Sequence, residues 1–203
     1  MFSVHAWARR AALGLFLAAS GLLGGCASAY LDASVKEVPA AQFKKPAAPG
    51  PVQLLFEFQT KGVRNAKATE MLQERVIAQV KASGLFTDVG ASTVPSGASL
   101  SITLNNVPMS DDAFSKGFLT GLTLGLAGTQ VGDGYVCTAS YRAPGSSAPV
   151  VKQARHAIYT TLGATGGPSN AVKMPDHKEA AFQMTTQVVS NVLNDLSQDA
   201  SFK

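Results

Sequence analysis

Two segments of this chain have a helical repeat that is apolar on one face only. In residues 64–84, Leu72, Val76 and Val80 recur every four residues, and the charged residues fall on the opposite arc. Residues 176–196 show the same one-sided pattern. Their apolar face gathers Ala181, Phe182, Val188, Val189, Val192, Leu193 and Leu196. Each helix must bury its apolar stripe against another element, and this requirement constrains the fold more than any other feature.

Strand signals lie between and around these helices, where apolar and polar side chains alternate as they do in half-buried strands. Strands are expected at 52–59, 85–90, 99–107, 134–143 and 149–163. Turn-forming residues at 144–149 predict an antiparallel hairpin. The sequence therefore predicts an α+β domain over residues 52–199. It would be a single mostly antiparallel sheet with both helices on one face, plus a glycine-rich apolar helical insert at 111–130.

Three residues carry the signals for helix ends. Asp176, followed by Glu179 three residues later, is typical of a capping box at the start of the second helix. Gly84 is expected to end the first helix, because glycine accepts the left-handed backbone conformation found after many helices.

The N-terminus has the pattern of an export signal. Arg9 and Arg10 precede an apolar run at residues 11–23, which is too short to span a bilayer comfortably. The run ends in Leu23-Gly24-Gly25-Cys26. This junction resembles the lipobox of bacterial lipoprotein signal peptides.

The resemblance implies that residues 1–25 are a signal peptide, cleaved between Gly25 and Cys26. Cys26 would then carry a diacylglycerol and an N-terminal acyl chain such as palmitate, and two or more chains anchor a protein stably. Ala27, in place of aspartate, implies the outer membrane of a Gram-negative cell, with the protein facing the periplasm. The alternatives are an ordinary signal peptide with a chance cysteine, an uncleaved membrane helix, or twin-arginine export, which the residues around Arg9 and Arg10 match poorly.

Residues 26–51 have no lasting period and contain several prolines, so we expect a flexible tether between lipid and domain. Loss of the signal peptide lowers the net charge from +4 to +2, because it removes two arginines. No basic cluster exceeds Lys44-Lys45, and this argues against a nucleic-acid partner.

Few residues of the mature chain suggest chemistry. His156 is expected to be a structural histidine on a strand, His177 a solvated residue in a first helical turn, and Cys137 a buried thiol with no cysteine to pair with. Asp111 and Asp112 fit a helix start better than a pair of catalytic carboxylates. No metal-ligand spacing or phosphate-binding loop is present, so we predict a protein that is not an enzyme and has no cofactor and no metal.

The insert contains a glycine zipper, Gly117, Gly121 and Gly125, with large apolar residues such as Phe118 and Leu122 between the glycines. On a helix the three glycines share one stripe, which lets another backbone approach closely. The insert could cover the domain's own sheet, dip into the membrane, or contact a partner or a second copy. The sequence predicts a contact helix and leaves its partner open.

The order of elements is similar to that of small periplasmic outer-membrane lipoproteins built as two helices on a sheet. Together with the lipobox, it favours a lipid-anchored cell-envelope lipoprotein that acts as a binding or assembly module. Its partners would be the membrane, through the lipid, and an envelope protein or another copy of the chain. The alternative is a protein that handles an amphiphile such as a lipid or lipopolysaccharide. A hydrolase is a distant third hypothesis.

Overall fold

The computed structural model describes residues 27–109, 130–163 and 166–202. The strands in this part of the chain are β1 (Ala27–Asp32), β2 (Val52–Thr60), β3 (Val63–Arg64), β4 (Val89–Gly90), β5 (Ser99–Met109), β6 (Gln130–Arg142), β7 (Val150–Leu162) and β8 (Ala171–Lys173). The helices are the 3-10 turn η1 (Ala40–Gln42), α2 (Ala66–Ala82) and α4 (His177–Gln198).

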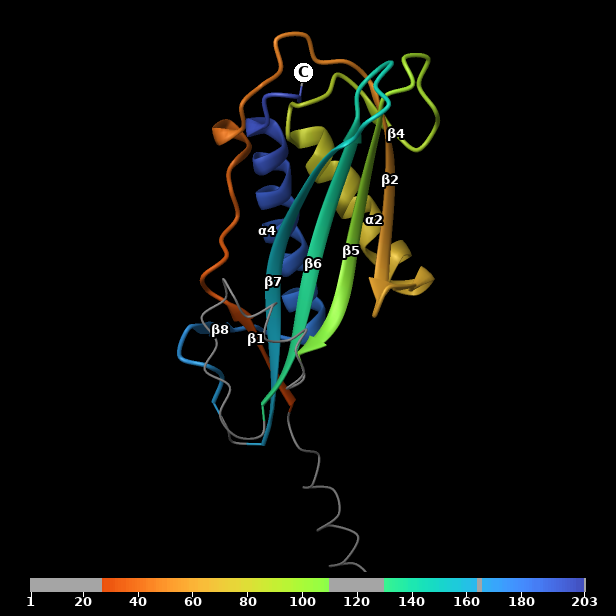
Figure 1. Cartoon of the computed structure of the whole chain (residues 1–203). Helices are drawn as coiled ribbons and strands as arrows, with labels where there is room; N and C mark the ends of the chain where they lie inside the picture. The colour runs from red at the N-terminus through yellow and green to blue at the C-terminus, as the bar shows by residue number, and fades with distance from the viewer. Residues whose placement is uncertain (1–26, 110–129, 164–165, 203) are drawn as a thin grey trace, which may run out of the picture.

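All eight strands belong to one sheet with the order β3-β2-β5-β6-β7-β1-β8, and β4 adds to β2 (Figure 1). Most neighbouring pairs are antiparallel, including the predicted hairpin of β6 and β7. β2 pairs in parallel with both β4 and β5. A parallel pair needs a crossover connection, and α2, which follows β2 in the chain, provides it. The predicted α+β class with a single mostly antiparallel sheet is confirmed.

Both helices cover the same face of the sheet (Figure 1). Leu72, Val76 and Val80 of α2 are fully buried, as the four-residue spacing predicted. α4 packs mainly on β7 and also contacts α2. Its buried apolar residues are Ala180, Met184, Val188, Val189, Val192, Leu193 and Leu196, whereas Ala181 and Phe182 are only partly buried.

The strands supply the other half of the core through alternate residues. Leu100, Ile102 and Leu104 of β5 are all fully buried. The register places Leu104 opposite Cys137 and Ile102 opposite Ala139, which are also fully buried. Because successive side chains point to opposite faces of a strand, one residue in two reaches the helices.

The caps follow the sequence signals. The N–H of Glu179 donates to Asp176 Oδ1 at 2.8 Å, which satisfies a free amide at the start of α4. Asn65 caps α2 in the same way, because the N–H of Ala68 donates to its Oδ1 at 3.0 Å. Gly84 follows the last turn of α2 with φ +66°, the conformation expected of a glycine there.

The expected tether is wrong for residues 27–51. Residues 27–31 pair with the last residues of β7, from Ala27 with Leu162 to Leu31 with Ile158. The side chains of Ala29 and Leu31 are buried in the main core. The folded domain therefore includes residues before 52, from Ala27 onward.

The chain between β1 and β2 runs along α4, as Figure 1 shows in orange. Its irregular backbone is held by α4 side chains: Ser190 Oγ accepts from the N–H of Val38 at 2.9 Å, and Ser197 Oγ accepts from that of Lys44 at 3.1 Å. Phe43 adds a buried aromatic side chain. Hydroxyl groups of α4 thus accept backbone hydrogen bonds that a neighbouring strand would otherwise accept. This fixes the segment between β1 and β2 although its sequence has no period.

The signal peptide, the lipobox and nearly all of the insert lie outside the described residues. This includes Gly25, Cys26, Gly117, Phe118, Gly121, Leu122 and Gly125. Within the described residues, neither α2 nor α4 has the length and apolar character that a bilayer-spanning helix requires.

Candidate functional site

His156 occupies a fully buried position between β7 and α4. Its Nδ1 accepts the N–H of Ala157 at 2.8 Å, and its Nε2 lies 2.6 Å from Gln187 Oε1. Since Oε1 can only accept, the ring carries its proton on Nε2. Burial lowers the pKa of His156 below its usual range, against the opposing effects of the Gln187 bond, the Ala157 carbonyl 3.2 Å from Nδ1 and the charge of Asp32. His156 is a neutral structural residue, as predicted.

His177 begins α4 and is exposed. Its Nε2 lies 3.1 Å from Thr160 Oγ1 of β7. Among the described residues, no group of three or more histidine, cysteine, aspartate or glutamate side chains could hold a metal ion.

Asp32 was not expected from the sequence and is fully buried at the end of β1. Its Oδ1 accepts from Ser34 N at 2.7 Å and from Ser34 Oγ at 2.6 Å, and its Oδ2 accepts from the Tyr159 hydroxyl at 3.1 Å. Burial, and secondarily the Asp32 carboxylate, raise the pKa of Tyr159 above its usual range. The Tyr159 bond fastens the end of β1 to β7 and leaves Tyr159 as a hydrogen-bond donor.

Cys137 is fully buried on β6. Burial raises the pKa of its thiol to about 12. A thiol needs its thiolate form to act as a nucleophile, so this cysteine is inert in the folded protein.

The strongest candidate for a binding site is an open stretch on the outer side of β2. β4 pairs only with Val52 and Gln53, and β3 pairs only with Gln59 and Thr60. Phe58 is covered by α2 and its cap, because its N–H donates to Thr69 Oγ1 at 2.9 Å and its carbonyl accepts from Asn65 N–H at 2.8 Å.

Residues 54–57 therefore have no partner strand on the side away from β5 within the described part of the chain. We call these four residues the β2 edge.

The direction of the backbone shows what the β2 edge offers. The N–H of Gln53 donates toward β5, to the carbonyl of Ala98 at 3.1 Å, whereas that of Val52 donates away from it, to Asp88 at 2.9 Å. Because N–H groups alternate along a strand, that of Phe56 also points away from β5. It faces the side where no strand is described.

A shallow hollow with a volume of about 490 Å³ lies over this edge. Its lining comes from β2, β3, β5, α2 and the turn after β4: Leu54, Leu55, Phe56, Glu57, Arg64, Thr69, Gln73, Ala91, Ser101 and Thr103. Leu55 is 49% exposed and lies on the sheet face opposite the helices.

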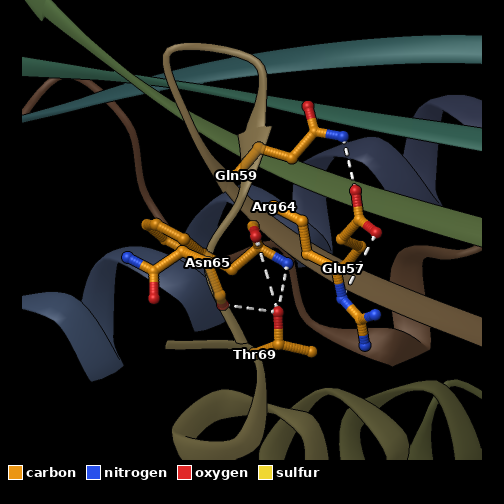
Figure 2. A network of polar contacts seen from close by, with 6 residues as sticks. Glu57, Gln59, Arg64, Asn65 and Thr69 are labelled. Carbon is orange, nitrogen blue, oxygen red and sulfur yellow. Dashed lines mark hydrogen bonds and ion pairs between the residues drawn. The ribbon is translucent and has the colours of Figure 1, made fainter. Parts of the chain in front are cut away.

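Three residues of the lining, Glu57, Arg64 and Thr69, belong to a network of polar contacts (Figure 2). Glu57 receives a hydrogen bond from Gln59 Nε2 at 2.6 Å, and its other oxygen lies 3.7 Å from Arg64 Nε. Thr69 Oγ1, besides its bond with Phe58, donates to the Asn65 carbonyl at 2.9 Å. An unpaired strand segment beside apolar and charged groups can accept an extended peptide as an added strand.

Sequence reasoning placed β2 but could not locate its open stretch. The open stretch depends on β3 and β4, which have only two residues each. Neither has enough residues to show alternation.

Comparisons with known proteins assign no family. No protein-family model and no curated protein matches the chain. A solved neuraminyllactose-binding hemagglutinin homolog from Helicobacter pylori is 11% identical, with a TM-score of 0.41 and coverage of 82% of this chain and 92% of that chain. Two PelC dodecamer structures from Paraburkholderia phytofirmans are 14% and 13% identical. Both have a TM-score of 0.33 and cover 84% of this chain, with 97% and 96% of theirs covered. At these values the likeness assigns no function.

The lowered pKa of His156 predicts a loss of stability in mild acid. At pH values below the usual histidine pKa, His156 binds a proton more readily in the unfolded chain than in the folded chain. The free energy of unfolding therefore falls from pH 7.5 to pH 5. His156→Gln should flatten this fall while lowering stability at pH 7.5 by about 1–3 kcal/mol, the usual cost of disturbing buried polar groups. Urea unfolding at several pH values measures both effects. His177→Gln, at an exposed site, is the matched control for the loss of a histidine side chain.

Burial of Cys137 predicts protection from alkylation. In a Cys26→Ser background it is the only thiol. With a pKa of about 12, only about one thiol in ten thousand is ionised at pH 8. Iodoacetamide at pH 8 should leave the native protein unlabelled and label it fully in denaturant, as mass spectrometry would report. Native labelling at the rate of free cysteine would contradict the assigned burial.

Proposed function

We propose that this protein is a lipid-anchored binding or assembly module of the bacterial cell envelope, attached to the outer membrane and facing the periplasm. The observation that carries the anchoring is the Leu23-Gly24-Gly25-Cys26 junction after an apolar run of signal-peptide length. The binding role is supported by the β2 edge, which offers an outward N–H at Phe56 beside exposed Leu55.

The chemistry of the described residues supports a role in binding. Cys137 and His156, a thiol and an imidazole that could in principle act as nucleophile or base, are fully buried and held in structural positions. In this proposal an envelope protein docks an extended segment on the β2 edge. Backbone hydrogen bonds would then supply affinity, and contacts with the flanking side chains would supply selectivity.

A second candidate, the handling of an amphiphile, is supported by a hollow of about 630 Å³ between α2 and α4. Met71 and Phe182 line it, but so do Glu37, Glu74 and Arg75. Arg75 stacks on the Phe182 ring at 4.2 Å from its centroid. Mass spectrometry of lipids retained by the purified domain without the signal peptide, residues 27–203, separates the two candidates, because a stoichiometric lipid favours the second.

The anchoring is tested at Cys26. Cys26→Ser removes the thiol that would accept the diacylglycerol, so metabolic labelling with a fatty-acid analogue should be lost, and a longer, uncleaved precursor should accumulate. Gel fluorescence and intact mass measure the two effects. Equal labelling of wild type and variant would refute the lipoprotein assignment.

The binding role is tested at Leu55. Leu55→Lys places a charge beside the β2 edge, and charged residues at sheet edges oppose the addition of a strand. Cross-linking and affinity purification of the acylated protein from its own membranes should then lose the co-purifying partner. Val151→Lys is a matched control, since Val151 is 50% exposed on the same sheet face, at β7. Equal recovery of the partner with both variants would exclude the β2 edge as its docking site.

A further inference from the structure

The structure leaves no spacer between the proposed lipid and the folded domain. Ala27, which directly follows Cys26, already belongs to β1 and pairs with Leu162, the last residue of β7. One residue spans at most about 3.6 Å. The inference below rests on the proposed function, because it takes Cys26 as the anchored residue.

β7 ends and β6 begins at the end of the sheet where β1 begins. Ser28 and Gln130 lie on the two sides of Thr161, so the start of β6 is two strands away from the start of β1. Neighbouring strands are about 4.8 Å apart, which puts these two starting points about 10 Å from each other. We call this end of the sheet, where Ala27, Gln130 and Leu162 lie, the anchor end (Figure 1, below the β1 label).

The anchor end has an exposed apolar side chain. Leu162 is 56% exposed. The connection between β5 and β6 leaves the sheet at Met109, opposite Gly132, and rejoins it at Gln130. Lipid attachment, an exposed leucine and both ends of this connection therefore share one end of the molecule.

We propose that the anchor end rests on the surface of the lipid bilayer and that the sheet stands away from it along β7. If Cys26 is acylated, the anchor end is one residue from the lipid. No linker would then allow this end of the domain to move away from the membrane. Burial of exposed apolar groups at that end stabilises the contact.

This orientation places the β2 edge far from the membrane. The register connects Glu57 through Thr103 and Thr138 to Gln153, nine residues before Leu162 on β7. At about 3.3 Å per residue, the β2 edge begins about 30 Å above the anchor end. A partner on that edge would be held in the periplasm, clear of the lipid headgroups.

Tryptophan fluorescence in vesicles tests the orientation. The mature chain would contain no tryptophan, because Trp7, the only one, lies in the signal peptide. Leu162→Trp and Val151→Trp place a single reporter at opposite ends of β7, eleven residues or about 36 Å apart. Both positions are about half exposed, at 56% and 50%, so both variants should fold, as circular dichroism would verify.

Each acylated variant is reconstituted into phosphatidylcholine vesicles, with and without acyl chains brominated near the headgroup. Brominated lipid should reduce the emission of Leu162→Trp at least about twofold and leave that of Val151→Trp unchanged. Equal quenching of the two variants, or stronger quenching of Val151→Trp, overturns the orientation. The absence of quenching in both overturns it as well, because the anchor end then does not contact the lipid.

Intact mass separates this result from the proposed function. A lipid on Cys26 without quenching at position 162 rejects the orientation and retains the anchor. A chain without the lipid, or an unsubstituted protein with tryptophan emission from a retained signal peptide, rejects both.

Discussion

The pairing of β7 on both sides determines the position of everything else in this molecule. β6 follows it along its whole length, from Gln130 opposite Thr161 to Tyr141 opposite Val150. β1 pairs with its last residues on the other side. Because α4 packs on the inner face of the same strand, the first strand, the longest hairpin and the last helix are all located by β7.

Polar groups make the attachment of the N-terminal segment specific. Asp32 is fully buried, and its carboxylate would be costly there without the donors from Ser34 and Tyr159. Ser190 and Ser197 then fix the backbone that follows, along the length of α4. Apolar packing alone would allow β1 to shift its register against β7, whereas the hydrogen bonds of Asp32 fix the register at the end of β1.

The sequence alone predicted the elements that are long enough to show a repeat of apolar residues. β2, β5, β6, β7, α2 and α4 each present enough residues for a period of two or nearly four to be visible. β1 was missed because it has six residues beside a proline-rich segment, and its partner Leu162 lies far along the chain. The spacing of residues cannot reveal Asp32 or Tyr159 as partners, nor can it reveal an open β2 edge, since all three depend on which strands become neighbours. His156 and Cys137 were interpretable because each lies in a strand whose alternation is clear.

The β2 edge is short, and the proposed anchor explains how so short an edge could be sufficient for binding. Four residues expose few outward backbone groups, and Glu57 and Arg64 at one end disfavour indiscriminate strand pairing. A contact of this size is weak between freely diffusing proteins, because association must first offset the loss of translational and rotational freedom. If both partners are confined to one membrane surface, their effective concentration rises and the weak contact becomes sufficient. In that case a longer edge would be a disadvantage, since it would also pair with unfolded chains in transit through the periplasm. Selectivity would come from the flanking side chains, and affinity would come largely from the anchor.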